Sequence, residues 1–252
     1  MTRECDDVLY YAHIARLVYQ DPSAYRVTDT DLLEGALPRF IDVNDCHAMI
    51  FERRGALVVA FRGSDSDTDM YRVLRAHLRP FILGDPPISC GMVHAGFYEY
   101  YMNLRDALNH HIDGYLKCAT VQQVVFVGHS LGSSCVLAAL ECTLRRPRPH
   151  VMCYTYGSPR VGDFQFSTIL IRRIEAQNLV RVVNRRDMIT RMPSASCGCC
   201  LFTHPRGGRE VGKATTLRCF LFEIIFFIVM FRCVYMSLLE HHDIDAYIEA
   251  LS

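Results

Sequence analysis

The sequence contains no tryptophan and almost no lysine. Lys117 and Lys213 are the only lysines among 27 basic residues, and 27 acidic residues balance the basic ones, so the formal net charge is zero. A chain without excess positive charge does not bind nucleic acid by bulk electrostatic attraction. We therefore expect no nucleic-acid partner, and a biased genome composition accounts for the abundance of arginine.

Cysteine is also too sparse for a small secreted protein held together by disulfides. Twelve cysteines in 252 residues fall short of the density of a small secreted scaffold held together by disulfides. No Asn-x-Ser/Thr glycosylation site occurs, and residues 1–7 carry acids where a signal peptide needs an apolar run. These features predict an intracellular protein with free, mostly buried thiols.

One group of cysteines raises the question of a metal site. Cys197, Cys199 and Cys200 are clustered, but zinc ribbons bring pairs two residues apart with a second pair downstream. The next cysteines, Cys219 and Cys233, lie in or beside an apolar stretch. We therefore expect neither a metal nor an organic cofactor.

Length and composition predict one large globular domain. Half of the residues are apolar and 21% are charged, which excludes a disordered or collagen-like chain. No repeat, low-complexity tract or linker divides the chain, so a single domain over residues 1–252 is expected. Strand and helix patterns alternate, which predicts an α/β fold with a mostly parallel sheet covered on both faces. The expected strands are 48–52, 56–61, 124–127, 151–156 and 179–184, and the expected helices are 8–18, 97–117, 131–146 and 163–176, with a last helix after 243.

Residues 128–132 (GHSLG) fit the pattern Gly-x-Ser-x-Gly. The pattern alone is weak, but here it follows a short apolar strand and precedes a helix. That is the placement of a nucleophile elbow, in which glycines permit a tight turn that exposes the serine hydroxyl at the end of the sheet. The helix dipole then lies beside the developing oxyanion. Ser130 is therefore the candidate nucleophile.

A serine nucleophile needs a base, and the base needs an orienting carboxylate. In folds with this elbow the acid follows the serine in the chain and the histidine comes last. Asp187 stands just after the expected strand 179–184, which makes it the candidate acid. His241 and His242 stand before the last helix, and on this argument either could be the base.

Several ordered motifs resemble the class 3 lipases, the fungal-type triacylglycerol lipases and their plant relatives in the α/β-hydrolase superfamily. The resemblance runs from about Val58 to Tyr247. It is carried by 59–64 (VAFRGS), 93–97 (VHAGF), 128–132 (GHSLG), 156–163 (YGSPRVGD) and 181–187 (RVVNRRD). Tyr247, five residues after His242, is similar to the family's C-terminal His-x-x-x-x-Tyr and favours His242 over His241 as the base.

The resemblance also implies an oxyanion hole. In the family it is built from the residue after the nucleophile and the hydroxy residue of Phe-Arg-Gly-Ser/Thr, which here are Leu131 and Ser64. Chemistry requires the same, because a tetrahedral oxyanion needs converging donors from the elbow and from a loop after an earlier strand. The sequence departs from the family where the lid begins, because Met70 follows Asp69 in place of a tryptophan. The resemblance therefore extends to the triad but not to lid closure.

Structural roles are expected for the other notable polar residues. His94 and His129 are predicted to brace the backbone around the site, and His204 is predicted to be structural. Asp163 and Glu141 are predicted to cap or decorate helices.

Residues 217–239 are unusually apolar, and 224–231 contain no polar residue. A transmembrane helix of this length would be about 30 Å long and would place His242 across the bilayer from Ser130. General-base catalysis needs these side chains about 3 Å apart. We therefore expect a segment that does not cross a membrane, either buried in the core or in contact with a membrane surface, and its position near the expected base favours partial membrane contact.

The sequence predicts a serine hydrolase that cleaves carboxylic esters of lipids through an acyl-enzyme, with Ser130, His242 and Asp187 as the triad. The expected partner is a lipid ester substrate. The alternative is a degenerate lipase fold that serves as a membrane-associated interaction protein. The complete set of triad residues argues against this alternative, and the altered start of the lid argues for it.

Overall fold

The computed structural model describes residues 3–21, 31–63, 77–118, 120–193, 196–197, 200–207, 209–211 and 242–252. Several of the predictions fall outside these ranges. The oxyanion residue Ser64, the start of the lid at 69–70, the alternative base His241 and the apolar segment 217–239 lie outside the described residues.

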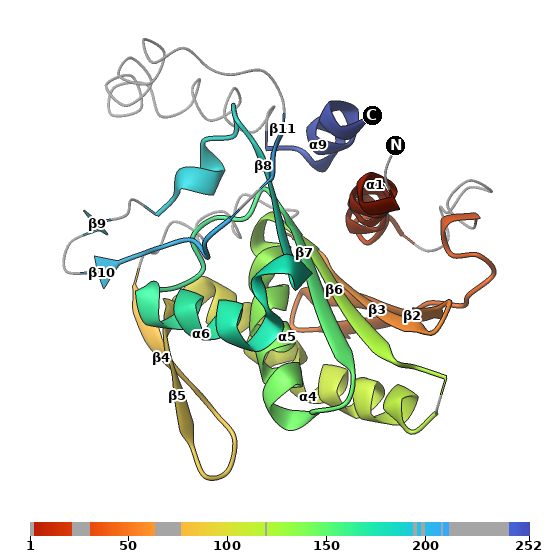
Figure 1. Cartoon of the computed structure of the whole chain (residues 1–252), viewed down its shortest axis with the longest axis horizontal. Helices are drawn as coiled ribbons and strands as arrows, with labels where there is room; N and C mark the ends of the chain where they lie inside the picture. The colour runs from red at the N-terminus through yellow and green to blue at the C-terminus, as the bar shows by residue number, and fades with distance from the viewer. Residues whose placement is uncertain are drawn as a thin grey trace.

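A seven-stranded sheet forms the centre of the molecule (Figure 1). Its strands lie in the order β1-β2-β3-β6-β7-β8-β11. The first three pair antiparallel, and from β3 to β11 every pairing is parallel. The strands are β1 (Arg39–Val43), β2 (Cys46–Arg53), β3 (Ala56–Phe61), β6 (Gln123–His129), β7 (His150–Tyr156), β8 (Leu179–Asn184) and β11 (Arg209–Val211).

Helices cover both faces of this sheet (Figure 1). On one face lie α4 (Ala95–Leu116), α5 (Cys135–Arg145) and α6 (Phe164–Ile174). On the other face lie α1 (Arg3–Leu17) and α9 (Ile244–Leu251), which pack against each other although they come from opposite ends of the chain. The predicted α/β fold with a mostly parallel, doubly covered sheet is confirmed.

The apolar run in β6 follows from this double cover. Side chains alternate between the two faces of a strand. Val124 and Phe126 therefore enter the core beneath α4 and α5, whereas Val125 and Val127 enter the core beneath α1. A strand with helices on both faces needs apolar residues at every position.

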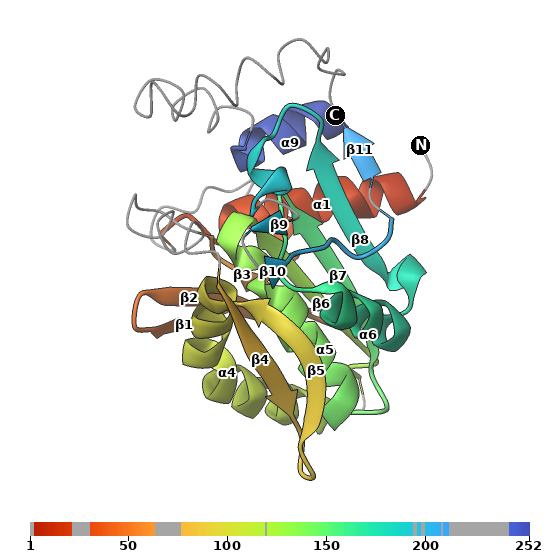
Figure 2. The same ribbon diagram turned by 90° about the vertical axis from the view of Figure 1, so that its left-hand side faces the viewer.

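Two further pairs of strands lie outside the central sheet. The hairpin of β4 (Leu78–Leu83) and β5 (Ile88–His94) extends away from α9 in Figure 2 and contacts α6 through β5. The short strands β9 (Ser196–Cys197) and β10 (Cys200–Leu201) pair with each other.

Two local predictions were wrong. The α-helix after the elbow begins at Cys135 rather than at 131, because Ser130–Ser134 forms the 3-10 turn η2. Glu141 does not decorate a helix surface: it is 1% exposed and accepts hydrogen bonds from Tyr101 and Arg105 of α4. A buried carboxylate is tolerated in the core when it is paired in this way. Asp163 caps α6 as predicted, since its side chain accepts from the Phe166 amide.

The domain limits 1–252 remain a prediction. Within the part of the chain that the structure describes, no helix combines the length and the apolar character needed to cross a bilayer.

Candidate active site

The candidate residues gather at one edge of the sheet. Because β6, β7 and β8 are parallel, their carboxyl ends meet at the same edge. Ser130 follows β6 directly, Asp187 lies three residues after β8, and His242 precedes α9. Ligands of open α/β sheets bind at this edge, outside the carboxyl ends of the strands.

Ser130 sits on a strained turn between β6 and η2. Its φ is +56°, in a region that residues other than glycine rarely adopt. The turn is possible because of its two glycines. A Cβ on Gly128 would lie within 3.0 Å of the Gly132 carbonyl oxygen, and a Cβ on Gly132 would lie within 3.0 Å of the Phe61 carbonyl oxygen. The sequence therefore folds into the elbow that the motif predicts.

Ser130, His242 and Asp187 form a continuous hydrogen-bonded chain. The Oγ of Ser130 lies 2.8 Å from Nε2 of His242, and Nδ1 of His242 lies 2.8 Å from Oδ2 of Asp187. All three are buried, and Asp187 is 0% exposed. These are the contacts that a serine nucleophile, its base and an orienting acid require. Of the two histidines left open by the chain order, His242 occupies the position of the base.

Asp187 accepts further hydrogen bonds that fix its orientation. The Tyr247 hydroxyl donates to Oδ2 over 2.6 Å, and the Ile189 amide donates to Oδ1 over 2.9 Å. Burial and the neighbouring carboxylate raise the pKa of Tyr247 well above its usual value, so this hydroxyl keeps its proton. Gly157 allows the close approach, since a Cβ there would lie 3.1 Å from Asp187 and from the His242 ring.

His129, next to the nucleophile, contacts the backbone of the candidate base. Its Nε2 lies 2.6 Å from the carbonyl oxygen of His242, and its Nδ1 lies 3.0 Å from the Tyr19 hydroxyl. The structure thus shows His129 as a brace, as the sequence predicted. His94 accepts from the Gly96 amide at the start of α4, and His204 contacts the Thr190 carbonyl, so neither points to the reacting groups.

The predicted oxyanion residues are only partly described. Leu131 follows the nucleophile in η2 and is fully buried, whereas Ser64 lies outside the described residues.

Sequence reasoning missed Tyr19. Its partner His129 lies 110 residues away, so no local pattern links the two.

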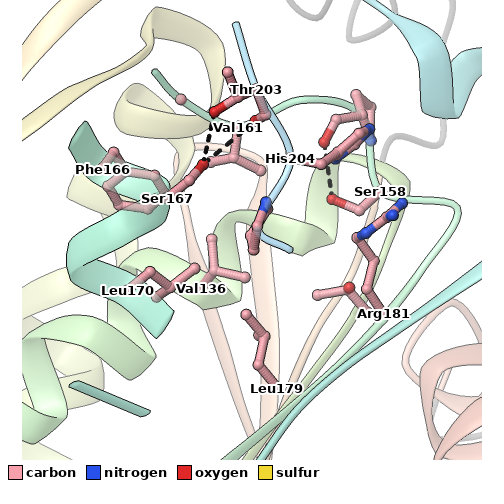
Figure 3. Close-up of a pocket in the computed structure, with 14 residues that line it drawn as sticks. Val136, Ser158, Val161, Phe166, Ser167, Leu170, Leu179, Arg181, Thr203 and His204 are labelled. Carbon is pink, nitrogen blue, oxygen red and sulfur yellow. Dashed lines mark hydrogen bonds between the residues drawn. The ribbon is translucent and has the colours of Figure 1, made fainter. Parts of the chain in front are cut away.

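A small cavity lies between α5, α6, β7 and β8 (Figure 3). Apolar side chains from the two helices line it, together with Ser158, Arg181 and His204. The hydroxyl of Ser158 bonds to the neighbouring Pro159 carbonyl. None of Ser130, Asp187 and His242 is among its lining residues, so the cavity is separate from the candidate active site.

Among the residues that the structure describes, no three His, Cys, Asp or Glu side chains are grouped so that they could hold a metal ion. The side chains of Cys197, Cys199 and Cys200 lie outside this description. The absence of a metal and of a cofactor remains a prediction.

Comparison with known proteins supports both the fold and the family. A solved fungal lipase in complex with an inhibitor superposes with a TM-score of 0.72 at 25% identity, over 85% of this chain and 82% of that one. The fold therefore places the chain among the α/β-hydrolases. The sequence profile of the class 3 lipases matches residues 58–197, which is more than half of the chain. The chain belongs to the class 3 lipase family.

Two curated relatives show how much of the chain is shared. A lipase of Rhizomucor miehei is 30% identical over 162 residues, which cover 62% of this chain and 43% of that protein. A secreted mono- and diacylglycerol lipase of Malassezia restricta is 32% identical over 123 residues, which cover 48% of this chain and 40% of that protein. The chain thus matches less than half the length of these relatives. Because one of them is named as secreted, the intracellular location remains a prediction.

Proposed function

We propose that the chain hydrolyses carboxylic esters of lipids through an acyl-enzyme formed on Ser130. The observation that carries the proposal is the hydrogen-bonded chain from Ser130 Oγ through His242 to Asp187, with both links at 2.8 Å. A serine hydroxyl is a weak nucleophile at neutral pH, and a base at this distance can remove its proton as it attacks.

In the first half of the reaction, Ser130 Oγ attacks the acyl carbonyl and His242 Nε2 accepts the hydroxyl proton. Asp187 holds the imidazole by Nδ1–H and stabilises the imidazolium that forms. His242 then gives its proton to the departing alcohol oxygen, and the acyl group remains on Ser130. In the second half, His242 takes a proton from water, hydroxide attacks the acyl-enzyme, and the fatty acid leaves as Ser130 regains its proton.

The negative charge on the tetrahedral intermediate requires donors on the opposite side of the carbonyl. By resemblance, the amide N–H of Leu131 supplies one donor and Ser64 supplies the other. The elbow supports the first assignment, because Leu131 follows Ser130 at the start of η2 and its amide belongs to the turn that presents the nucleophile.

A lipid substrate is inferred from family membership. The relatives are named as lipases, one of them for mono- and diacylglycerols. We propose an acylglycerol or a similar lipid ester as the substrate. The alternative is a catalytically degenerate lipase fold that acts as a membrane-associated interaction protein. This alternative has less support, because a degenerate site need not keep the buried hydrogen bonds between Ser130, His242 and Asp187, which are intact.

The test is hydrolysis of acyl esters of graded chain length, offered first as monomers and then as emulsions. We expect hydrolysis by the wild type and none above background by Ser130→Ala, with the chain-length dependence identifying the substrate class. An inactive wild type in both formats would favour the degenerate fold. Activity that persists in Ser130→Ala would contradict the assignment of the nucleophile.

A further inference from the structure

A path of hydrogen bonds leads from Tyr19, in the turn after α1, to the candidate base. The Tyr19 hydroxyl lies 3.0 Å from His129 Nδ1, and His129 Nε2 lies 2.6 Å from the His242 carbonyl oxygen. His129 is 5% exposed, and its ring centre lies 4.9 Å from that of His242. The reaction uses neither His129 nor Tyr19 directly, so the role of this path remains to be explained.

The two ends of the path determine where each proton lies. A carbonyl oxygen can only accept, so His129 must carry its proton on Nε2. Burial, with repulsion from His242, lowers the pKa of His129 to about 3, so the imidazole is neutral near pH 7 and its Nδ1 is an acceptor. The Tyr19 hydroxyl is then the donor, and burial raises its pKa above the usual value, so it keeps the proton that it donates.

The path connects the base to the nucleophile through a single residue. His129 is bonded covalently to Ser130, and it hydrogen-bonds to the main chain of His242. A displacement of the His242 backbone would lengthen the 2.8 Å contact between Nε2 and Ser130 Oγ. Misplacement of a reacting group by about 1 Å can reduce a rate about a hundredfold.

The Tyr19 end of the path lies against Gly63, which follows β3 and directly precedes the predicted oxyanion residue Ser64. A Cβ on Gly63 would lie 2.6 Å from the His129 carbonyl oxygen and closer still to the Tyr19 hydroxyl. The hydroxyl is thus packed between Gly63 and His129. One tyrosine contacts the elements that present the nucleophile and, by resemblance, the oxyanion donor.

We propose that Tyr19 and His129 are positioning residues for the base: the Tyr19 hydroxyl orients the His129 imidazole, which holds the His242 main chain at the nucleophile. This inference rests on the ester hydrolysis proposed above, with His242 as its base. Both hydrogen bonds are made to groups of the protein itself, so the loss of either residue is expected to change kcat rather than KM.

The first test removes the two hydrogen bonds separately. Tyr19→Phe deletes only the hydroxyl, and we expect kcat to fall about tenfold with KM unchanged within twofold. Tyr10→Phe is the matched control, because Tyr10 lies on α1, shortly before Tyr19 in the chain, and donates to the Leu32 carbonyl rather than to a group of the candidate active site. At His129, the Gln variant keeps a donor for the His242 carbonyl and is expected to retain far more activity than the Leu variant.

The double variant separates positioning from packing. If Tyr19 acts through the imidazole of His129, Tyr19→Phe should cost less than twofold in the His129→Gln background. A tyrosine that serves only to fill space would cause the same loss in both backgrounds, and that result would overturn the proposal. If Tyr19→Phe does not fold, the kcat values of His129→Gln and His129→Leu test the proposal instead. A higher kcat for His129→Gln supports it, and equal values contradict it.

A measurement that does not depend on turnover distinguishes this inference from the proposed function. Nitrogen-15 NMR of labelled histidines should show His129 neutral with the proton on Nε2, and Tyr19→Phe should shift Nδ1 toward the value of a nitrogen without a hydrogen-bond donor. An unchanged Nδ1 shift would contradict the hydrogen bond itself. A wild type without esterase activity would instead contradict the proposed function, and with it the role of the path.

Discussion

At the scale of single residues, Asp187 shows how the core can hold a charge beside the base. A buried carboxylate is costly unless hydrogen bonds replace its hydration. Here His242, Tyr247 and the Ile189 amide supply three such bonds. Because the group is 0% exposed, water does not screen its attraction for an imidazolium at His242. The residue is therefore suited to stabilise the charge that forms on His242 during the proposed reaction.

The adjacent histidines provide a test of the base. His242→Ala should lower kcat by about four to six orders of magnitude, because it removes the imidazole that is hydrogen-bonded to both Ser130 and Asp187. His241→Ala is the matched variant and should cost far less. Steady-state kinetics with a soluble ester measures both. The opposite order of effects would show that the offset of five residues to Tyr247 identifies the wrong histidine.

The residues of the site differ in how far the sequence predicts them. Ser130 follows from a local pattern, and Asp187 follows from chain order and its place after a strand. His242 required the resemblance as well, since chain order alone left His241 open. Tyr19 could not be predicted, because its role depends on a contact with a residue 110 positions away that only the folded chain creates.

At the scale of elements, the turn from β6 into η2 depends on backbone contacts that exclude a side chain. Gly132→Ala should destabilise the protein by about 2–4 kcal/mol and abolish esterase activity, because its Cβ would press on the Phe61 carbonyl oxygen and displace Ser130. Urea denaturation and ester hydrolysis measure the two effects.

Gly114→Ala is the matched control within α4. A Cβ there meets nothing within 4 Å, so the substitution should stabilise the helix by about 0.5–1 kcal/mol and leave activity unchanged. If the two alanine variants lose stability equally, the close approach at Gly132 does not explain why the elbow needs glycine.

The elements that were predicted share strong periodic signals. Strands β3, β6, β7 and β8 are β-branched apolar runs, and helical patterns follow β6 and β7. The hairpin β4–β5 was missed because its strands are weak in sequence: Pro80 interrupts β4, and only Phe81 and Leu83 of that strand are buried. A hairpin outside the central sheet, packed against α4 and α6 through part of its side chains, does not need the regular pattern of a central strand.

At the scale of the whole molecule, two buried histidines predict how stability depends on pH. Burial lowers the pKa of both His129 and His204 to about 3, against an ordinary value of 6.5. At each of these two sites the unfolded chain therefore binds up to one proton more than the folded chain at pH values between these limits. Stability should be retained above about pH 6.5 and fall as the pH drops below it, by up to about 1.4 kcal/mol per pH unit for each histidine.

Urea denaturation between pH 7.5 and 4.5 measures this slope, and the variants assign it. His204→Gln should reduce the slope below pH 6 by about 1 kcal/mol per pH unit, and so should His129→Gln. Carboxylates contribute equally to the wild type and the variants, so the difference isolates the histidine. Identical slopes would mean that these imidazoles are protonated in the folded state.

The topology of residues 217–239 is a second prediction at this scale. Ser130 and His242 lie on either side of this segment in sequence, yet their side chains are hydrogen-bonded. Arg16 and Asp245 also form an ion pair at 3.6 Å, which joins α1 to α9. We therefore propose that the segment does not cross a membrane, and its apolar composition favours partial contact with the membrane surface. Protease protection of tags at both termini should place the tags on the same side, and tags on opposite sides would exclude the triad.

The proposed hydrolysis requires Ser130 to be an activated nucleophile. The most direct measurement is labelling by a fluorophosphonate probe, followed by peptide mapping of the modified residue. An unactivated serine reacts slowly with this probe, whereas one paired with His242 should be labelled stoichiometrically. The account predicts a single modified residue, Ser130, and no labelling of Ser130→Ala or His242→Ala. Labelling that survives Ser130→Ala, or a folded wild type that does not react, would contradict it.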